Sequence, residues 1–131
     1  MKLSGVIALI SILLAGAACS YLPGSGPRVY RGWYTATGSE LSGFQPCGTH
    51  EVWSAAVSPE VKKVVYARVP PPEHFAESYG DDRHYQAYVE WRGELSGKGH
   101  YGHTGGLERQ LTVTEAAQVV DVRAAPPEGC H

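Results

Sequence analysis

The clearest structural signal in the chain is the segment Tyr85-Gln86-Ala87-Tyr88-Val89-Glu90-Trp91-Arg92-Gly93. Every second residue from Tyr85 to Trp91 is apolar or aromatic, and this alternation is typical of a strand with one buried and one solvated face. Tyr88 has the opposite phase, so we expect it on the solvated face, where it would be available to a binding surface. The segment therefore predicts a long β-strand.

Shorter strands are predicted on both sides of this segment, because β-branched and aromatic residues gather in runs of strand length. Phe44 is the expected core residue of the second run, which Pro46 and Gly48 restrict to a short or edge strand. In the last two runs the inward candidates are Leu111, Val113, Val120 and Val122. The runs cover residues 29–36, 41–48, 51–56, 107–114 and 118–123.

A helix is expected between the third and fourth strands. Ser58 and Pro59 suit the N-cap and the first helical position, and valines at helical spacing follow from Val61. The run of prolines that starts at Pro70 ends the helix. Residues 73–83 and 96–106 are polar or rich in glycine, and they predict surface loops.

The order of these elements predicts an all-β fold with one short helix. Five to six short strands, with the helix after the third, is the order of a small OB-like Greek-key barrel. Closure of such a barrel removes the exposed strand edges that promote aggregation. We assign this barrel domain to residues 29–131.

Composition excludes several classes of protein. The chain has 131 residues, of which 43% are hydrophobic and 18% charged, a balance typical of a globular domain. Its formal net charge is −2, so it lacks the basic surface that nucleic-acid binding requires. No Gly-x-Ser-x-Gly motif is present, and Cys47 beside His50 would act as a nucleophile only with an activated thiol. The sequence therefore predicts neither an enzyme nor a nucleic-acid-binding protein, and it implies no cofactor.

The first 18 residues have the pattern of a signal peptide. Lys2 precedes an uncharged apolar run, which small residues follow up to Ala18. The run from Gly5 to Ala18 has about 14 residues, whereas a helix needs roughly 20 to span a bilayer. We therefore expect removal of residues 1–18, and an uncleaved membrane anchor is the alternative.

Cys19 follows this leader at the position that a lipobox gives to the acylated cysteine. The segment Leu13-Leu14-Ala15-Gly16-Ala17-Ala18-Cys19 resembles a bacterial lipobox, except that Gly16 replaces the usual leucine. The resemblance implies a lipidated Cys19, with residues 19–28 as a flexible tether rich in Gly and Pro. Since Ser20 differs from the usual inner-membrane retention residue, it also implies an outer-membrane anchor facing the periplasm. Cleavage that leaves Cys19 unmodified would instead give a soluble periplasmic protein.

Two cysteines remain if Cys19 carries a lipid. Exported proteins tolerate disulfides, so we predict that Cys47 and Cys130 pair. The closed loop would contain about 80 residues, for which the chain-entropy model gives about 4.5 kcal/mol. Free thiols, an intermolecular disulfide, or a metal site that includes His131 remain alternatives.

His100 and His103 are the best candidates for metal ligands. They lie three residues apart within a glycine-rich segment, and the sequence indicates no third ligand beside them. A solvated loop is the simpler interpretation, because ordering such a segment around an ion costs conformational entropy. The alternative function that these residues suggest is a periplasmic metal-binding or copper-stress protein.

Several short motifs carry a family resemblance, and they appear in a consistent order. The motifs are Gly32-Trp33-Tyr34, Phe44-Gln45-Pro46-Cys47-Gly48, the helix at 61–66, Tyr88-Val89-Glu90-Trp91-Arg92-Gly93 and Leu111-Thr112-Val113. Over residues 29–123 they resemble the C-terminal OB-fold domain of the NlpE-like copper-resistance and envelope-stress lipoproteins. The paired-cysteine motif of that family's N-terminal domain does not occur in this sequence. The resemblance therefore implies an exported barrel on a lipid, and it does not carry the family's copper handling or stress signalling over to this chain.

The sequence as a whole predicts a lipid-anchored protein of the cell envelope. We expect its barrel to be a non-catalytic binding or assembly module, attached to the membrane by the lipid. An envelope protein or a glycan is the expected partner.

Overall fold

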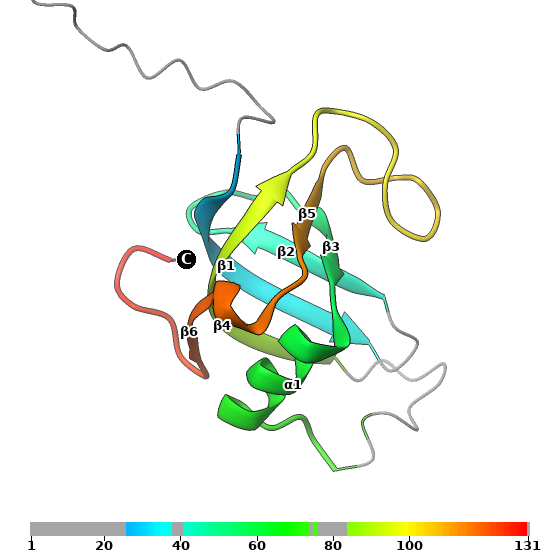
Figure 1. The fold of residues 1–131 in the computed structure, drawn as a ribbon. Coiled ribbons are helices and arrows are strands. Elements are labelled where there is room, and N and C mark those ends of the chain that lie inside the picture. Colours follow the sequence, from blue (N-terminus) through cyan, green and yellow to red (C-terminus); the bar gives the residue numbers. More distant parts are fainter. Residues whose placement is uncertain (1–25, 38–40, 74, 76–83, 131) are drawn as a thin grey trace, which may run out of the picture.

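The computed structural model describes residues 26–37, 41–73, 75 and 84–130, and it confirms the predicted barrel (Figure 1). The signal peptide, Cys19 and most of the predicted tether lie outside the described residues, as do 74 and 76–83 of the predicted 73–83 loop. The described part contains one α-helix and six strands. These are β1 (Arg28–Thr37), β2 (Ser42–Pro46), β3 (Trp53–Val57), α1 (Pro59–Arg68), β4 (His84–Leu95), β5 (Gln110–Val113) and β6 (Val119–Arg123), with a short 3₁₀ turn, η2 (Ala116–Gln118), before β6.

Five of the strands close into a barrel. The hydrogen-bonded order is β1-β2-β3-β5-β4, and β4 pairs again with β1 to complete the ring. The β3–β5 pairing is parallel, whereas the other pairings are antiparallel. The sixth strand, β6, lies outside the ring and pairs with β4. This is the predicted OB-like topology with one additional strand.

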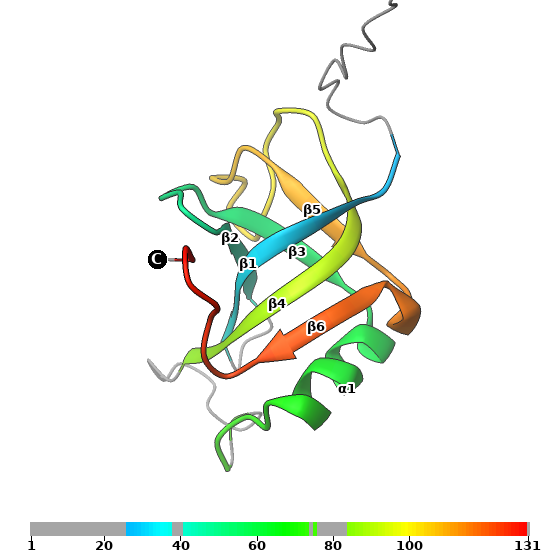
Figure 2. The same ribbon diagram turned by 90° about the vertical axis from the view of Figure 1, so that its left-hand side faces the viewer.

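The helix α1 begins where the sequence predicts. The Ser58 side chain accepts a hydrogen bond from the Val61 backbone N–H at 3.2 Å, and Pro59 occupies the first helical position. Val61 and Val65 are fully buried, and the helix lies beside β6 (Figure 2). Within the described residues, no helix is long and apolar enough to cross a membrane.

Aromatic rings fill the interior of the barrel. Phe44 stacks between Trp53 and Trp91, at centroid distances of 5.7 and 5.9 Å. Tyr34 packs against Trp91 and Tyr85. The alternation predicted for the 85–93 strand is confirmed on this side, since its apolar residues face the core. Such stacked and edge-on pairs add to the stability gained by apolar burial.

Phe75 also belongs to this core, although the sequence places it in a surface loop. Its side chain is only 8% exposed, and its ring lies 6.0 Å from that of Tyr85. The polar composition of the surrounding segment concealed this apolar residue.

One inward prediction in β6 is wrong. Leu111, Val113 and Val122 are buried as expected, but Val120 is 50% exposed and Val119 is buried instead. The register between β4 and β6 shifts at Glu90 and Trp91, where an irregularity interrupts the pairing. A bulge of this kind breaks the alternation of faces, so the phase set by Val122 does not continue to Val120.

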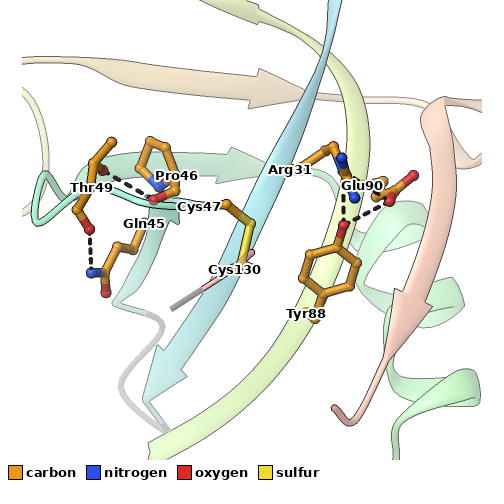
Figure 3. Close-up of a disulfide and its surroundings, with 8 residues drawn as sticks. All are labelled: Arg31, Gln45, Pro46, Cys47, Thr49, Tyr88, Glu90 and Cys130. Atoms are coloured by element: carbon orange, nitrogen blue, oxygen red, sulfur yellow. Dashed lines mark hydrogen bonds and ion pairs between the residues drawn. A yellow bond between two sulfur atoms is a disulfide. The ribbon is translucent and has the colours of Figure 1, made fainter. Parts of the chain in front are cut away.

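The prediction that Tyr88 is exposed to solvent is also wrong. Tyr88 has the outward phase on β4, yet its side chain is fully buried. Its ring packs edge-on against Trp33, and its hydroxyl donates a 2.6 Å hydrogen bond to Glu90. Arg31 Nε donates to the same hydroxyl at 3.0 Å (Figure 3). Burial and the Glu90 carboxylate raise the pKa of Tyr88.

A C-terminal tail runs along this outer side of the barrel. The tail leaves β6 at Arg123, which pairs with Tyr88, and it ends at Cys130, which is bonded to Cys47. The Cys47 backbone N–H in turn donates to the Arg31 carbonyl of β1. Residues 124–130 therefore cross β4 and β1 on the outside of the barrel, as the course of the red segment shows (Figures 1 and 2).

Candidate functional site

One hollow lined by described residues is a groove on the outside of the barrel. It has a volume of about 920 Å³, and it lies between the outer face of β1, β2, β3 and β5 and the loop that joins β4 to β5. This loop projects from the end of the barrel at which the chain enters β1 (Figure 1). OB folds use the face of strands 2 and 3, with the loop between strands 4 and 5, to bind ligands. The groove therefore occupies the position that this architecture favours for a site.

A row of paired residues forms the floor of the groove. Thr35 of β1 pairs with Gly43 of β2, Gly43 pairs with Ser54 of β3, and Ser54 pairs with Gln110 of β5. Paired residues point to the same side of a sheet, so this row presents two hydroxyls and one amide outward. Gly43 keeps the floor open, because a Cβ there would lie only 3.2 Å from the Thr35 hydroxyl.

Ser54 is the buried polar residue of this floor. Its side chain hydroxyl donates to Gln110 Oε1 across 3.5 Å, which is the outer limit of a hydrogen bond. Only 8% of the residue is exposed. A buried hydroxyl with so weak a hydrogen bond is stabilised when a closer donor or acceptor binds it. Ser54 is therefore well placed to bind a polar group in the groove.

The loop that forms the wall of the groove is held by backbone hydrogen bonds. Tyr101 and Leu107 exchange a pair of these bonds, at 2.8 and 3.1 Å, and Gly99 donates to Glu108 at 2.9 Å. Gly102 has a positive φ of 82° and accepts from the Gly105 N–H to close the tip. The glycine-rich segment is therefore a small ordered hairpin, although its composition predicts only a flexible loop.

Residues with aromatic and imidazole side chains complete the lining of the groove. Tyr101 and His103 come from the hairpin, and His84 comes from the start of β4. The ring of Tyr101 lies over Gly99, where an added Cβ would approach it to 3.0 Å. Leu41 and Leu107 supply apolar surface. The sequence did not indicate Tyr101 as a groove residue, because only the hydrogen bonds within the loop bring Tyr101 beside the sheet.

No Asp, Glu, Lys or Arg occurs among the described residues that line the groove. Its polar groups are hydroxyls, an amide and imidazoles, which can donate as well as accept hydrogen bonds. A ligand bound here meets no ionic side chain in this lining.

The two histidines predicted as weak metal candidates have different surroundings. His103 lines the groove together with His84, whereas His100 is exposed outside the lining. Within the described ranges, no three His, Cys, Asp or Glu residues gather closely enough to hold a metal ion. The structure thus provides no third ligand for this pair in the part of the chain that it describes.

The predicted cysteine pairing is confirmed. Cys47 and Cys130 form a disulfide with a Cα–Cα distance of 4.5 Å (Figure 3). Pro46 and Thr49 beside it form a turn, since the Pro46 carbonyl accepts from both the Thr49 N–H and its hydroxyl. Cys130 is buried at 4% exposure. The disulfide therefore acts as a structural cross-link that holds the C-terminal tail at one edge of the outer surface.

No family model matches this sequence, and no curated protein or solved structure is similar enough to it to count as a match.

Proposed function

We propose that this chain is a lipid-anchored protein of the bacterial cell envelope whose barrel is a non-catalytic binding module. The observation that carries the binding role is the open groove on the outer face of β1, β2, β3 and β5. The groove presents hydrogen-bonding groups on a closed, rigid sheet, and an ordered hairpin forms its wall. This arrangement orients a ligand but provides no nucleophile with a partnering base, which most hydrolytic mechanisms need.

The location rests on the N-terminal sequence and on the disulfide. Residues 1–18 have the pattern of an export signal, and Cys19 follows at the lipobox position. A disulfide between Cys47 and Cys130 favours an oxidising compartment, such as the periplasm or the cell surface. Two or more acyl chains at Cys19 would keep the barrel on the membrane without a spanning helix.

The location is tested by intact mass measurement of the protein from isolated bacterial membranes. We expect a chain that begins at Cys19 and carries acyl groups. The Cys19→Ser variant should lose the added mass and leave the membrane fraction. An unmodified Cys19 in the membrane-extracted wild-type protein would contradict the lipid anchor.

The binding role is tested by photo-crosslinking in intact cells. A photoreactive residue at Thr104, which lines the groove, should capture an envelope component. The same residue at Glu60, an exposed position on α1, is the matched control. Equal labelling from both positions would contradict a binding role for the groove.

Metal binding by His100 and His103 is the rival hypothesis, and titration with Cu(II) or Zn(II) separates it from ours. A tight site that disappears in the His100→Ala/His103→Ala variant would favour the metal-binding function. We expect the wild type and the variant to give the same weak response, because the described residues add no third ligand.

A further inference from the structure

We infer that the groove binds an uncharged, hydroxyl-rich ligand, and specifically a neutral saccharide chain. This inference deepens the proposed function and rests on it. It follows from three properties of the groove: the charge of its lining, the pairing of its strands and the chemistry of its polar groups.

The charge of the lining argues against ionic ligands. The described lining contains no Asp, Glu, Lys or Arg. A phosphate, a uronic acid or a protonated amine would lose water on entering the groove and would find no opposite charge there. Because an unpaired charge is costly to remove from water, this lining selects against nucleic acids and charged polysaccharides.

The pairing of the strands argues against a peptide bound as an additional strand. Recognition of that kind requires a strand edge with free backbone groups. Thr35, Gly43 and Ser54 of the floor are each paired with residues of both neighbouring strands. The floor of the groove therefore offers side chains rather than backbone groups to a ligand.

The polar groups of the floor match those of a sugar. The hydroxyls of Thr35 and Ser54 can each donate and accept, and so can the amide of Gln110. Sugar hydroxyls have the same dual character, so each contact can form in either direction. The weak 3.5 Å contact between Ser54 and Gln110 leaves both groups able to bind a ligand more closely.

The wall supplies the apolar contact that a sugar ring requires. Tyr101 is held beside the groove by its backbone bonds to Leu107 and by the absence of a side chain at Gly99. An aromatic face fixed in this way loses little conformational entropy on binding. The volume of about 920 Å³ falls in the usual range for small-molecule sites, and it leaves room for a short oligosaccharide.

The inference is tested with the full mature protein, extracted in detergent, on an array of neutral, acidic and basic oligosaccharides. Single-stranded DNA and an uncharged peptide complete the array. We expect binding to neutral saccharides alone, with a weak dependence on salt. Binding confined to acidic saccharides, basic saccharides, DNA or the peptide would overturn the inference, and so would no binding to any of these probes.

Two variants locate the binding in the groove. Thr35→Val removes one floor hydroxyl at nearly constant shape, and Tyr101→Leu removes the aromatic face. Each should weaken binding by about three- to tenfold, which corresponds to one hydrogen bond or one ring contact. Thr112→Val is the matched control, because Thr112 lies on the outer side of β5 outside the lining, and it should bind as the wild type does.

Folding is checked for every variant by the urea midpoint. A folded Thr35→Val that binds neutral saccharides as tightly as Thr112→Val would overturn the placement of the ligand in the groove. The proposed function can survive that result, since the photo-crosslinking and the mass of Cys19 test it independently. Conversely, if the protein carries no lipid but still binds neutral saccharides, the lipid anchor is contradicted and the saccharide-binding inference is not.

Discussion

At the scale of single residues, the core contains a tyrosine hydroxyl without a hydrogen bond. Tyr34 is fully buried, and its hydroxyl makes no hydrogen bond, although the hydroxyls of Tyr66 and Ser42 lie nearby. Tyr85 differs, because its hydroxyl donates to the Val69 carbonyl at 2.7 Å. The two tyrosines therefore form a natural comparison between an unsatisfied and a satisfied buried hydroxyl.

The first prediction concerns these hydroxyls. Tyr34→Phe should leave the free energy of unfolding unchanged or raise it slightly, because the substitution removes an unpaired polar group from the core. Tyr85→Phe should lower the free energy of unfolding by about 1 kcal/mol, because it breaks a hydrogen bond. Urea unfolding of both variants measures the difference, and a larger loss for Tyr34→Phe would contradict the prediction.

The second prediction concerns alkaline pH. Burial raises the pKa of Tyr34 and of Tyr85, and the neighbouring Tyr66 adds to both shifts. In the unfolded chain a tyrosine loses its proton near pH 10, whereas the folded protein retains these protons to higher pH. Above about pH 10 the unfolded state therefore binds fewer protons, and the free energy of unfolding falls as the pH rises.

Urea unfolding at a series of pH values measures this loss. The Tyr34→Phe variant lacks one of the buried phenols whose pKa is raised, so its free energy of unfolding should fall less steeply above pH 10 than that of the wild type. Below pH 10 these tyrosines keep their protons in both the folded and the unfolded state, so the free energy of unfolding of both proteins should not depend on them. Identical slopes would contradict the assignment of the effect to Tyr34.

At the scale of elements, β6 shows how a bulge changes which side chains are buried. The third prediction follows from its observed register. Val122→Ala should lower the free energy of unfolding by about 2 kcal/mol, because it leaves a cavity in the core. Val120→Ala should change it by less than about 0.5 kcal/mol, since that side chain is 50% exposed. Equal effects in urea unfolding would contradict the register.

Elements governed by local chemistry were predictable from the sequence. Ser58 caps α1, Pro59 starts it, and the valines that follow reach the core, because capping and helical spacing depend on neighbours in sequence. The phase of β4 was equally clear on its inner side. The exposure of Val120 was not predictable from the sequence, because a bulge depends on how two distant strands pair.

At the scale of the whole molecule, the disulfide fixes the tail across the outside of the barrel. The fourth prediction is that the double variant Cys47→Ala/Cys130→Ala loses about 4 kcal/mol of stability in urea unfolding. Release of the tail should also expose Tyr88. Nitration with tetranitromethane should then modify Tyr88 in the variant but not in the wild type.

Tyr34 is the internal control for this experiment, because it lies inside the barrel and does not depend on the tail for its burial. Nitration of both tyrosines would indicate unfolding of the barrel rather than release of the tail. A Tyr88 that stays unmodified in the folded double variant would contradict the role of residues 124–130 as its cover.

Only part of the candidate site could be predicted from the sequence. The sequence indicated an exported barrel, a paired Cys47 and Cys130, and histidines near one loop. It did not indicate the floor formed by Thr35, Ser54 and Gln110, since these residues are far apart in the chain. Serine and threonine at outward positions of strands are common, so nothing local distinguishes those that share a row.

The sequence by itself determined the inward phase of β4, the helix and its cap, and the two cysteines that pair, because each depends on short-range patterning or on a small number of thiols. Only the tertiary structure decided which outward residues remain accessible. Tyr88 is buried on the outer side of β4, whereas the hairpin and the aligned strands bring Thr35, Ser54 and Tyr101 to one groove. The physical reason is that accessibility depends on what the rest of the chain places over a side chain, and strand register and loop closure settle that only in the folded molecule.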